Sequence, residues 1–235
     1  MRNHPNRIPP SGTIGRSAPR QPRLRPGRRV RDQVDRADLA VIARTAGRSP
    51  RSRVGSSLVT DDLAARVHRV SHLTGEFVLR SGRVATEYFD KYLFEADPVL
   101  LDEVAAGMAA LVPDGTEVLA GLEMGGIAVV TALGRHTGLP CAFVRKTPKP
   151  YGTRRLAEGA AVAGRRVLLV EDVVTSGGQV VLSAGQLRDL DARISHALCV
   201  IDRQEGGTEA LAAAGVTLRS LLTRADLEAA ARGPA

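Results

Sequence analysis

The stretch of residues 165–178, with the sequence RRVLLVEDVVTSGG, limits the possible folds of this chain more than any other. Residues 167–170 form an uninterrupted apolar run that is too short for a buried helix and rich in valine. They therefore predict a strand of a parallel sheet that is covered on both faces. Glu171 and Asp172 follow this run. We expect the two acids at the C-terminal edge of an open α/β sheet, which is where such sheets bind ligands.

A phosphate-binding loop is predicted directly after the two acids. Thr175, Ser176, Gly177 and Gly178 lead into residues 180–190, whose apolar spacing is that of a helix. Glycines let the backbone approach a ligand closely, and hydroxyls and the amides of a helix N-terminus donate hydrogen bonds to phosphate oxygens. The neighbouring carboxylates suit a polyol or a magnesium-bound group. A phosphorylated ribose fits both features.

The same stretch resembles a known nucleotide-related motif. It is not a Walker A loop, because no lysine follows the glycines, and no G-x-G-x-x-G follows a strand. Two acids followed closely by Thr-Ser-Gly-Gly resemble the 5-phosphoribosyl-1-pyrophosphate (PRPP) motif of the type I phosphoribosyltransferases, and the plain alternative is a strand that ends in a solvated acidic turn. The resemblance implies that PRPP is bound by Glu171, Asp172, Val173, Val174, Thr175, Ser176, Gly177 and Gly178.

The positive charge of the chain is concentrated at its N-terminus. Residues 1–56 hold 14 of the 33 basic residues, all arginine, and 3 of the 25 acids, so this segment carries +11 and the remainder −3. It is rich in Pro, Gly, Arg and Ser without sustained periodicity, so we expect a disordered Arg/Pro-rich tail. A linker, a misplaced start and an arginine arm for nucleic acid are the alternatives. Nucleic acid is disfavoured because the tail has no aromatic residues to stack on bases.

Cysteine usage and the lengths of the apolar runs bear on the compartment. Cys141 and Cys199 each lie in an apolar, strand-like run, and we interpret them as small buried hydrophobic residues rather than as a disulfide or metal pair. No apolar run approaches membrane-spanning length and no signal-peptide segment follows the N-terminus. We therefore expect a cytoplasmic protein without membrane contact. Its 235 residues have room for one α/β domain and an appendage.

Between the tail and the sheet, the sequence predicts a helix, two strands and a second helix. Thr60 is a plausible N-cap for the first helix, and Gly75 is expected to end it. Residues 77–94 predict two strands around a turn and contain three of the four Phe and two of the three Tyr. These aromatic residues fit either an ordinary core or, beside two arginines, a site for a flat anionic base. Asp97 and Pro98 are an N-cap and N1 pair that opens the second helix.

From residue 117 onward, strands, loops and helices alternate, which predicts a parallel sheet with right-handed crossovers. Strands are expected at residues 117–120, 141–144, 167–170, 195–201 and 216–222, with a final helix at residues 225–231. The loop 121–126 opens a helix, so its amides form a second anion site at the same edge of the sheet. The loop 147–159 is too long and too polar for a bare connection and is typical of a lid.

The flanking segments narrow the resemblance to one family. LRSGR with YFD downstream, RKTPKPYGTRRLAEG, the acid-pair motif and IDRQEGG occur in this order. Over residues 58–231 they resemble orotate phosphoribosyltransferase, including the domain found in UMP synthases. The resemblance implies an α/β fold in which a parallel sheet flanked by helices (core 96–235) carries a small N-terminal hood (57–95). It also implies that PRPP and orotate give orotidine 5′-monophosphate and pyrophosphate, with Mg²⁺ carried on PRPP.

The same resemblance implies roles for individual residues and an assembly. A homodimer is expected, with the loop 146–159 shared across its interface. Glu171 and Asp172 would take the ribose hydroxyls. The residues implied around orotate are Arg80, Tyr88, Phe89, Thr175 and Arg203, the last of which offers a fork that matches a carboxylate. Those implied over the leaving pyrophosphate are Arg145, Lys146, Lys149 and Tyr151. The catalytic candidates are Lys146, Lys149 and Asp172.

The chain departs from the family's pattern in two places. Many members have Tyr-Lys-Gly in the pyrophosphate loop, whereas this chain reads Glu123-Met124-Gly125-Gly126, without the lysine. Tyr151 stands where several bacterial members have histidine, and the UMP synthase form has tyrosine there. Two other functions stay open, namely a phosphoribosyltransferase for another base and a PRPP-sensing regulator with a basic arm. The cations of the predicted lid favour an enzyme, because a sensor has no leaving group to surround.

Overall fold

The computed structural model describes residues 56–78, 82–149 and 155–232 of the chain, with side chains from residue 62 onward. The tail predicted for residues 1–56 therefore lies outside the described residues, apart from Ser56. Arg80 and Tyr151, both predicted to bind substrate, also lie outside them. Within the described residues, no helix is long and apolar enough to cross a membrane.

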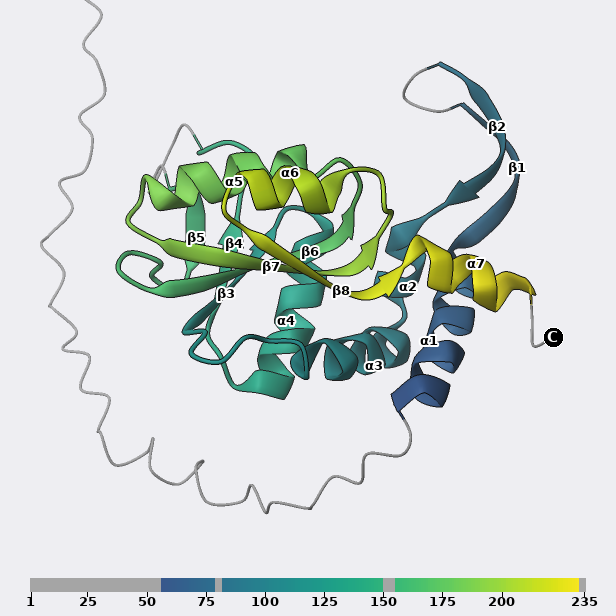
Figure 1. The fold of residues 1–235 in the computed structure, drawn as a ribbon, viewed down its shortest axis with the longest axis horizontal. Coiled ribbons are helices and arrows are strands. Elements are labelled where there is room, and N and C mark those ends of the chain that lie inside the picture. The colour runs from purple at the N-terminus through teal and green to yellow at the C-terminus, as the bar shows by residue number, and fades with distance from the viewer. Residues whose placement is uncertain (1–55, 79–81, 150–154, 233–235) are drawn as a thin grey trace, which may run out of the picture. The chain divides into compact units, whose positions relative to one another are not determined.

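A six-stranded sheet forms the centre of the described structure (Figure 1). Its strands are β3 (Val118–Leu122), β4 (Cys141–Val144), β5 (Ala157–Gly159), β6 (Arg166–Val174), β7 (Arg193–Asp202) and β8 (Thr217–Thr223). They lie in the order β5-β4-β3-β6-β7-β8, and all neighbours are parallel except β4 and β5. The predicted parallel sheet is confirmed, with one antiparallel strand added at its edge.

The strand order reverses between β3 and β6. From β3 the chain crosses to β4 on one side and then returns to β6 on the other side. The loops after β3 and β6 therefore leave the sheet at adjacent positions and lead to different helices. Such a switch point is where open α/β sheets bind ligands. The two loops predicted to bind anions, residues 121–126 and 175–178, are the two loops that meet here.

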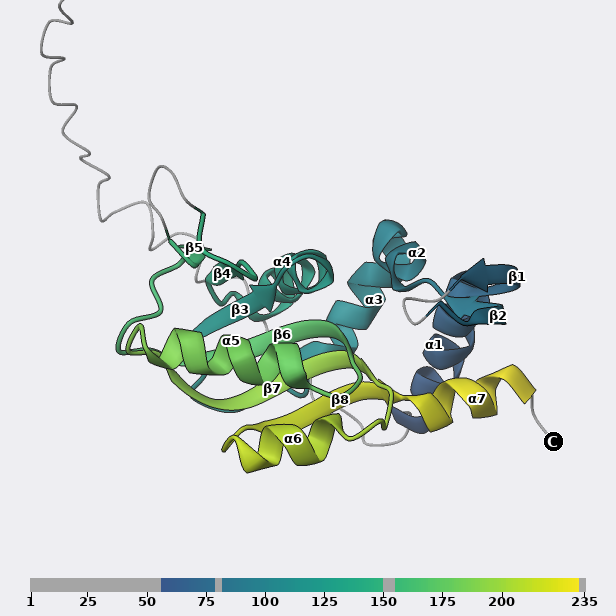
Figure 2. The same cartoon turned by 90° about the horizontal axis from the view of Figure 1, so that it is seen from above.

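Helices cover both faces of the sheet, which explains why its central strands are apolar along most of their length. On one face, the core includes residues of α1 (Ser56–Ser71), α3 (Pro98–Ala109), α4 (Gly125–Thr137) and α7 (Arg224–Arg232). On the other face, α5 (Gly178–Arg188) and α6 (Gly207–Ala213) contribute to a second core. Figure 2 shows α4 and α6 on opposite sides of the sheet.

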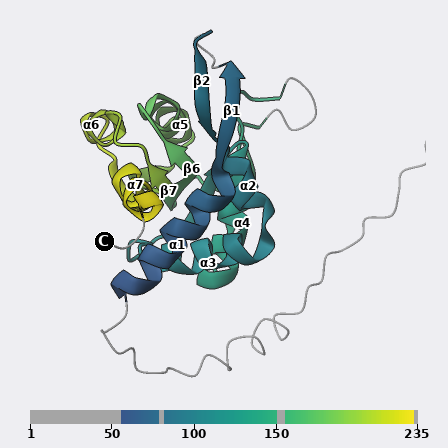
Figure 3. The same ribbon diagram turned by 90° about the vertical axis from the view of Figure 1, so that its right-hand side faces the viewer.

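A hairpin and two helices, α1 and α2 (Lys91–Ala96), precede α3 and the sheet, and we refer to them together as the hood. Strands β1 (His72–Val78) and β2 (Val84–Phe89) form the antiparallel hairpin, and α2 connects it to α3. Helix α1 packs against α2, α3 and α7. The hairpin rises from these helices, as Figure 3 shows. Phe94 of α2 is fully buried and fixes the hood to the core.

The first helix differs from the prediction at both ends. It begins at Ser56 rather than after Thr60, because residues 56–59 contain neither Gly nor Pro and nothing in them resists a helix. It ends at Ser71, and Gly75 lies inside β1. The pairing of β1 with β2 is irregular next to Gly75, as expected for a glycine that marks a bulge rather than a helix cap.

Residues 91–96 form α2, where the aromatic run predicts the end of a strand. Asp90 caps this helix, and its side chain accepts a hydrogen bond from the Tyr92 amide at 3.1 Å. The cap outweighs the strand preference of the aromatic residues. The other predicted cap is confirmed, because the Asp97 side chain accepts hydrogen bonds from two amides in the first turn of α3.

Strand β6 is longer than predicted. The apolar run predicts that it ends before the acids, but its pairing with β7 continues to Val174, opposite Asp202. Val173 and Val174 are β-branched and suit a strand, so the two acids lie inside the strand. Sequence reasoning also missed β5, which has only three residues, and α6, which begins after Gly206 in a left-handed conformation with φ 89°.

Phe94 provides a test of how the hood is held. Phe94→Ala removes a fully buried ring from the core shared by α1, α3 and α4. We expect the free energy of unfolding to fall by about 3–5 kcal/mol, measured by chemical denaturation. Leu93→Ala on the same helix is the control, because Leu93 is 36% exposed and its loss should be much smaller. Equal losses for the two variants would contradict this packing.

Candidate active site

The loop between β6 and α5 has the features of a phosphate site. Thr175 and Ser176 are exposed, and Gly177 adopts a left-handed conformation with φ 74°. A side chain at residue 177 would also meet Leu211 of α6 at 2.5 Å, so both the turn and its packing require glycine. No side chain of the described residues caps α5. The amides of its first turn are therefore available to an anion at the carboxyl edge of the sheet.

A second helix N-terminus, that of α4, lies on the other side of the switch point. Gly125 and Gly126 form its first turn and are buried, and Met124 at the cap position makes no side-chain cap. A Cβ atom at residue 125 would lie 1.6 Å from Oδ2 of Asp172 in β6. Glycine therefore lets α4 approach the acid of the neighbouring strand. No larger residue fits here unless the helix or the acid moves.

Asp172 is the centre of a cluster of charged groups. Its side chain is fully buried, and Nζ of Lys91 in α2 lies 2.5 Å from its Oδ2 atom. Glu95 is four residues after Lys91 and thus on the same side of α2, and Glu171 precedes Asp172 in β6. Glu95 Oε1 lies 2.8 Å from the Cβ position of residue 125. Three carboxyls and one ammonium therefore meet between β6, α2 and the N-terminus of α4.

Burial and proximity determine the protonation of this cluster. Burial, followed by the charge of Asp172, raises the pKa of Glu171 to about 9. Burial, followed by the contact with Asp172, raises the pKa of Glu95 to about 8. Burial acts to raise the pKa of Asp172 too, but the Lys91 ammonium outweighs it and holds this pKa below its usual range. At neutral pH the cluster therefore holds one ion pair, Asp172 with Lys91, and two protonated carboxyls.

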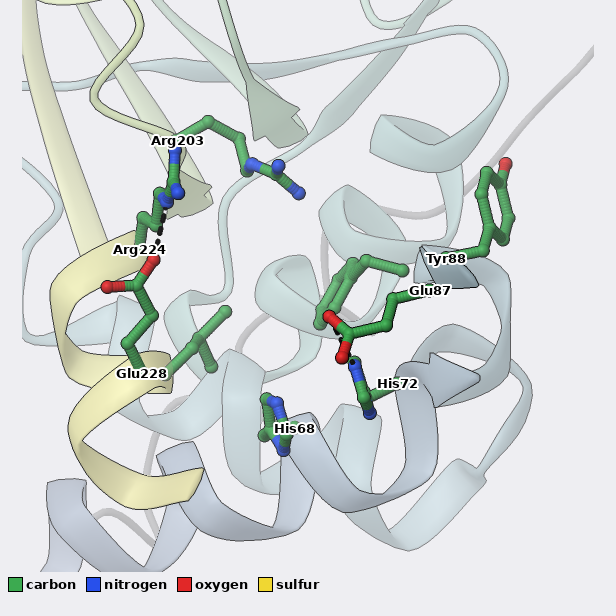
Figure 4. A pocket seen from close by; sticks show the side chains of 9 residues that line it. His68, His72, Glu87, Tyr88, Arg203, Arg224 and Glu228 are labelled. Carbon is green, nitrogen blue, oxygen red and sulfur yellow. Dashed lines mark hydrogen bonds and ion pairs between the residues drawn. The ribbon is translucent and has the colours of Figure 1, made fainter. Parts of the chain in front are cut away.

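A cavity of about 260 Å³ lies between the hood and the carboxyl end of the sheet (Figure 4). Tyr88 and Phe89 of β2 line it on the hood side, and Arg203, which follows β7, lines it on the sheet side. The other lining residues are His68, His72, Glu87, Arg224, Leu227 and Glu228. Three of the residues predicted to bind the base are thus brought together around one cavity.

The two arginines of the cavity differ in how closely acids hold them. Arg224 Nε lies 2.6 Å from Glu228 Oε1, within α7. Arg203 Nε lies 3.5 Å from Glu205 Oε1, and Figure 4 shows the Arg203 side chain extending from the sheet side toward the hairpin. Because its acid lies farther away, Arg203 is the arginine better placed to receive an anion.

The aromatic wall of the cavity belongs to the hairpin. Tyr88 stacks on Phe77, with 5.4 Å between ring centroids.

Two histidines lie on the hood side of the cavity. The rings of His68 and His72 are stacked with their centroids 4.7 Å apart. Burial, followed by the nearby His72, lowers the pKa of His68. His72 Nε2 lies 3.4 Å from Glu87 Oε2 in the opposite strand of the hairpin. The lowered pKa leaves His68 without a charge at neutral pH, so His68 adds no positive charge to the cavity.

The predicted lid is described only at its two ends. Arg145 follows β4 directly and is partly buried. The amide of Lys146 donates to Glu123 Oε1 at 2.5 Å, which ties the start of the lid to the loop after β3. Nζ of Lys149 lies 2.5 Å from Glu158 Oε1 in β5. The start of the lid is thus fixed beside the loop after β3, and Lys149 is held on β5.

Sequence reasoning missed the two α2 residues of the acid cluster. Lys91 and Glu95 lie in an aromatic segment that predicts a strand of the hairpin, so the sequence gave no sign that they approach the acids of β6. Asp90 is the signal that could have found them, because an Asp at that position opens a helix and the i, i+4 spacing then places both residues together. The histidines and Arg224 of the cavity were also missed, because the sequence does not show which helices approach the hairpin.

The donor groups of the site bear on whether a metal ion can be held. Within the described residues, no group of three or more His, Cys, Asp and Glu side chains is arranged to hold a metal ion by itself. Glu171 and Asp172 nevertheless offer oxygen donors side by side. Magnesium is usually bound by one or two carboxylates together with substrate phosphates. The residues present therefore fit a magnesium ion that arrives with a phosphorylated substrate.

Comparison with known proteins places the chain in a family. No protein-family model matches it. It is 53% identical over 168 residues to an orotate phosphoribosyltransferase of Nocardioides sp., an alignment that covers 72% of this chain and 94% of that protein. Its fold is similar to that of the Mycobacterium tuberculosis orotate phosphoribosyltransferase in complex with Fe(III) dicitrate, with a TM-score of 0.67, 34% identity, and coverage of 72% of this chain and 98% of that one. It is also similar to that enzyme in complex with PRPP, with a TM-score of 0.63, 31% identity, and coverage of 72% and 99%.

These likenesses go beyond the fold. A shared fold alone would leave the base unspecified, because one fold serves many activities. The relative from Nocardioides shares more than half of its aligned residues with this chain over nearly its whole length. The chain therefore belongs to the orotate phosphoribosyltransferase family.

Proposed function

We propose that this protein transfers the phosphoribosyl group of PRPP to orotate, giving orotidine 5′-monophosphate and pyrophosphate in pyrimidine nucleotide biosynthesis. The observation that carries the proposal is a combination of two arrangements. In the first, the N-termini of α4 and α5, which have no side-chain caps, lie around an acid pair. In the second, Arg203, Tyr88 and Phe89 line one cavity. The first arrangement suits a doubly phosphorylated sugar. The second suits a planar anion. Family membership supports orotate as that anion.

The order of groups along the sheet edge matches the order of groups in PRPP. The 5-phosphate would lie on the loop of Thr175 and Gly177, at the N-terminus of α5. The ribose hydroxyls would donate to Glu171 and Asp172. The pyrophosphate would then point toward the N-terminus of α4 and the lid cations, which include Lys146. This order is proposed because the acid pair lies in β6, between the two helix N-termini.

Orotate would occupy the cavity next to the ribose. Its carboxylate and ring edge need a donor fork, which Arg203 supplies. Its faces need apolar contact, for which Tyr88 and Phe89 are available after movement of the hairpin. Thr175 and Arg80 complete the predicted set. The raised pKa of Glu171 keeps the neighbouring acid cluster short of negative charge before ligand binds, so an anionic base next to it meets less repulsion.

The chemistry that these residues can assist is a displacement at the first carbon of the ribose. A ring nitrogen of orotate loses its proton, which pyrophosphate or solvent accepts, and forms the new bond to this carbon, while pyrophosphate leaves with the electrons of the broken C–O bond. Positive charge develops on the ribosyl carbon, where Asp172 stabilises it, while the leaving group gains negative charge. Lys146 and Lys149 would stabilise the leaving group and exclude water. When bound, a magnesium ion carried by PRPP offsets further negative charge on the pyrophosphate.

A homodimer is part of the proposal, and an apolar groove supports it. The groove has a volume of about 560 Å³ and lies between α2, α3 and α4, where its lining extends from Met124 to Arg135. Its lining includes Leu101, Ile127 and Met124, and Met124 is 63% exposed. A second copy of the chain on this surface would lie beside the start of α4, since Met124 in the lining precedes the first turn of that helix. The sharing of loop 146–159 across the interface stays a prediction. The two free cysteines, Cys141 and Cys199, favour a reducing compartment such as the cytoplasm.

Asp172 provides the first test of the proposed sugar site. Asp172→Asn removes the charge that would accept from a ribose hydroxyl, and loss of a charge-assisted hydrogen bond costs about 1.5–3 kcal/mol. We therefore expect PRPP binding to weaken, or turnover to slow, by roughly tenfold or more. Calorimetric titration and steady-state kinetics measure this. Asp189→Asn, at the exposed end of α5, is the control. Unchanged PRPP affinity and turnover in Asp172→Asn would rule out the sugar assignment.

Arg203 tests the base site separately. Arg203→Ala leaves the carboxylate of orotate without its donor fork, so the KM for orotate should rise by roughly tenfold or more while the Kd for PRPP stays within about twofold. Arg224→Ala in the same cavity should have a smaller effect, because Glu228 already holds Arg224. Pyrophosphate release is measured with orotate, uracil, adenine and hypoxanthine. Wild-type preference for a purine base would overturn the orotate assignment.

The groove between α3 and α4 provides a test of the dimer. Thr131→Glu places a charge in this lining at a residue that is not part of the acid cluster, and it should shift the protein toward monomer in sedimentation velocity. Leu182→Glu is the control, because Leu182 is exposed on α5, on the other face of the sheet. If the variants sediment alike, the groove is not the dimer surface.

A further inference from the structure

The acid cluster contains one cation that no motif of the sequence assigns. Lys91 is the first residue of α2, directly after the Asp90 cap. Its Nζ atom lies 2.5 Å from Oδ2 of the fully buried Asp172, yet its side chain remains 31% exposed. One side of the ammonium therefore contacts the acid of the proposed sugar site, while part of the side chain stays open to solvent and thus to a ligand.

The position of Lys91 relative to α4 is fixed by their common neighbour. Oδ2 of Asp172 is the atom that a Cβ at residue 125 would meet first, at 1.6 Å, and it is also the atom that Lys91 contacts. The ammonium therefore lies close to the first turn of α4. An ammonium beside a helix N-terminus adds a full positive charge to the partial charge of the helix dipole. The two together make a stronger anion site than the helix end alone.

We propose that Lys91 is a further PRPP-binding residue, which supplies from the hood the positive charge at the pyrophosphate end that residue 125 has no room to supply. This inference rests on the proposed function and on the proposed order of PRPP along the sheet edge. It assigns to α2 a direct part in holding the leaving group. The hood would then bind the pyrophosphate as well as cover the base.

The contact with Asp172 is compatible with this role. A carboxylate oxygen has two lone pairs, so Asp172 can accept from Lys91 and from a ribose hydroxyl at the same time. The Lys91 ammonium has three N–H donors, and its contact with Asp172 leaves at least one of them for a ligand. The two other carboxyls of the cluster, Glu95 and Glu171, have raised pKa values and are mostly protonated at neutral pH. They therefore do not compete strongly for the charge of Lys91.

A purely structural role for Lys91 makes a different prediction, and two ligands separate the two roles. In the proposed order, ribose 5-phosphate would contact the acid pair and the α5 loop, and it has no pyrophosphate. If Lys91 binds pyrophosphate, losing its charge weakens PRPP and leaves ribose 5-phosphate nearly unaffected. If Lys91 only holds Asp172 in place, both ligands lose affinity by the same factor.

The test uses the full chain with three substitutions. Lys91→Gln can still donate to Asp172 but carries no charge, and we expect its Kd for PRPP to rise by roughly tenfold or more, as for a lost charge-assisted hydrogen bond, with the Kd for ribose 5-phosphate within about threefold. Lys91→Arg restores the charge and should recover most of the PRPP affinity. Arg66→Ala removes an ion pair with Glu103 that links α1 to α3 outside the site, and it controls for loosening of the hood.

Three results would contradict the role proposed for Lys91. Equal losses for PRPP and ribose 5-phosphate, unchanged PRPP affinity in Lys91→Gln, or an equal PRPP loss in Arg66→Ala would overturn the inference. Calorimetric titration gives the affinities, and circular dichroism shows whether each variant is folded. If Lys91→Gln does not fold, failure of the folded Lys91→Arg variant to bind PRPP better than ribose 5-phosphate contradicts the inference in its place. Wild-type protein that fails to bind PRPP would contradict the proposed function itself.

Discussion

The arrangement of the sheet edge depends on burying one ionised carboxylate, that of Asp172. Burying an isolated charge is costly, and it is tolerated only where the charge is paired and hydrogen-bonded. Asp172 meets both conditions, because Lys91 contacts Oδ2 and the Val173 amide donates to Oδ1 at 2.6 Å. One partner comes from the hood and the other from the strand itself. The ion pair therefore ties the hood to the central strand at the point where α4 also begins.

This ion pair also decides the electrostatic state of the unliganded site. A cluster of three ionised carboxyls would repel a substrate that carries several negative charges. Because Glu95 and Glu171 hold their protons at neutral pH, the cluster carries nearly no net charge before ligand binds. The acids can still serve the reaction, since a positive centre that forms beside them lowers their pKa values again. The same groups thus accept an anionic substrate and later stabilise a cationic centre.

Much of the fold follows from the sequence because each strand is short, apolar and followed by a loop with its own signature. The parallel sheet, the cap at Asp97 and the glycines of the phosphate loop are local features, and local features are legible in a sequence. The limits of β6 were misjudged because strand pairing with β7, rather than the polarity of Glu171 and Asp172, decides where it ends. The fate of Gly75 was misjudged for the same reason, since pairing in the hairpin drew it into β1.

The site was predictable only where one motif holds its residues together. The loop of Thr175 and Gly177 is contiguous, so the sequence displays it whole. Lys91 reaches Asp172 across 81 positions of the chain, and no periodicity can reveal such a contact. The cavity around Arg203 has the same character, because three separate parts of the chain form its walls. Resemblance to a family supplied some of these residues, and elementary patterning would not have supplied them.

The close approach of Gly125 to Asp172 also limits how this site can change during evolution. A lysine at residue 125 cannot be gained here by one substitution unless the helix or the acid moves, because its first side-chain carbon would overlap the buried acid. The acid cannot retreat while Lys91 holds it. A lineage that gains a lysine at residue 125 must therefore alter the start of α4 and the hood together. Residues 125 and 91 would have to change as a pair, even though 33 residues of sequence lie between them.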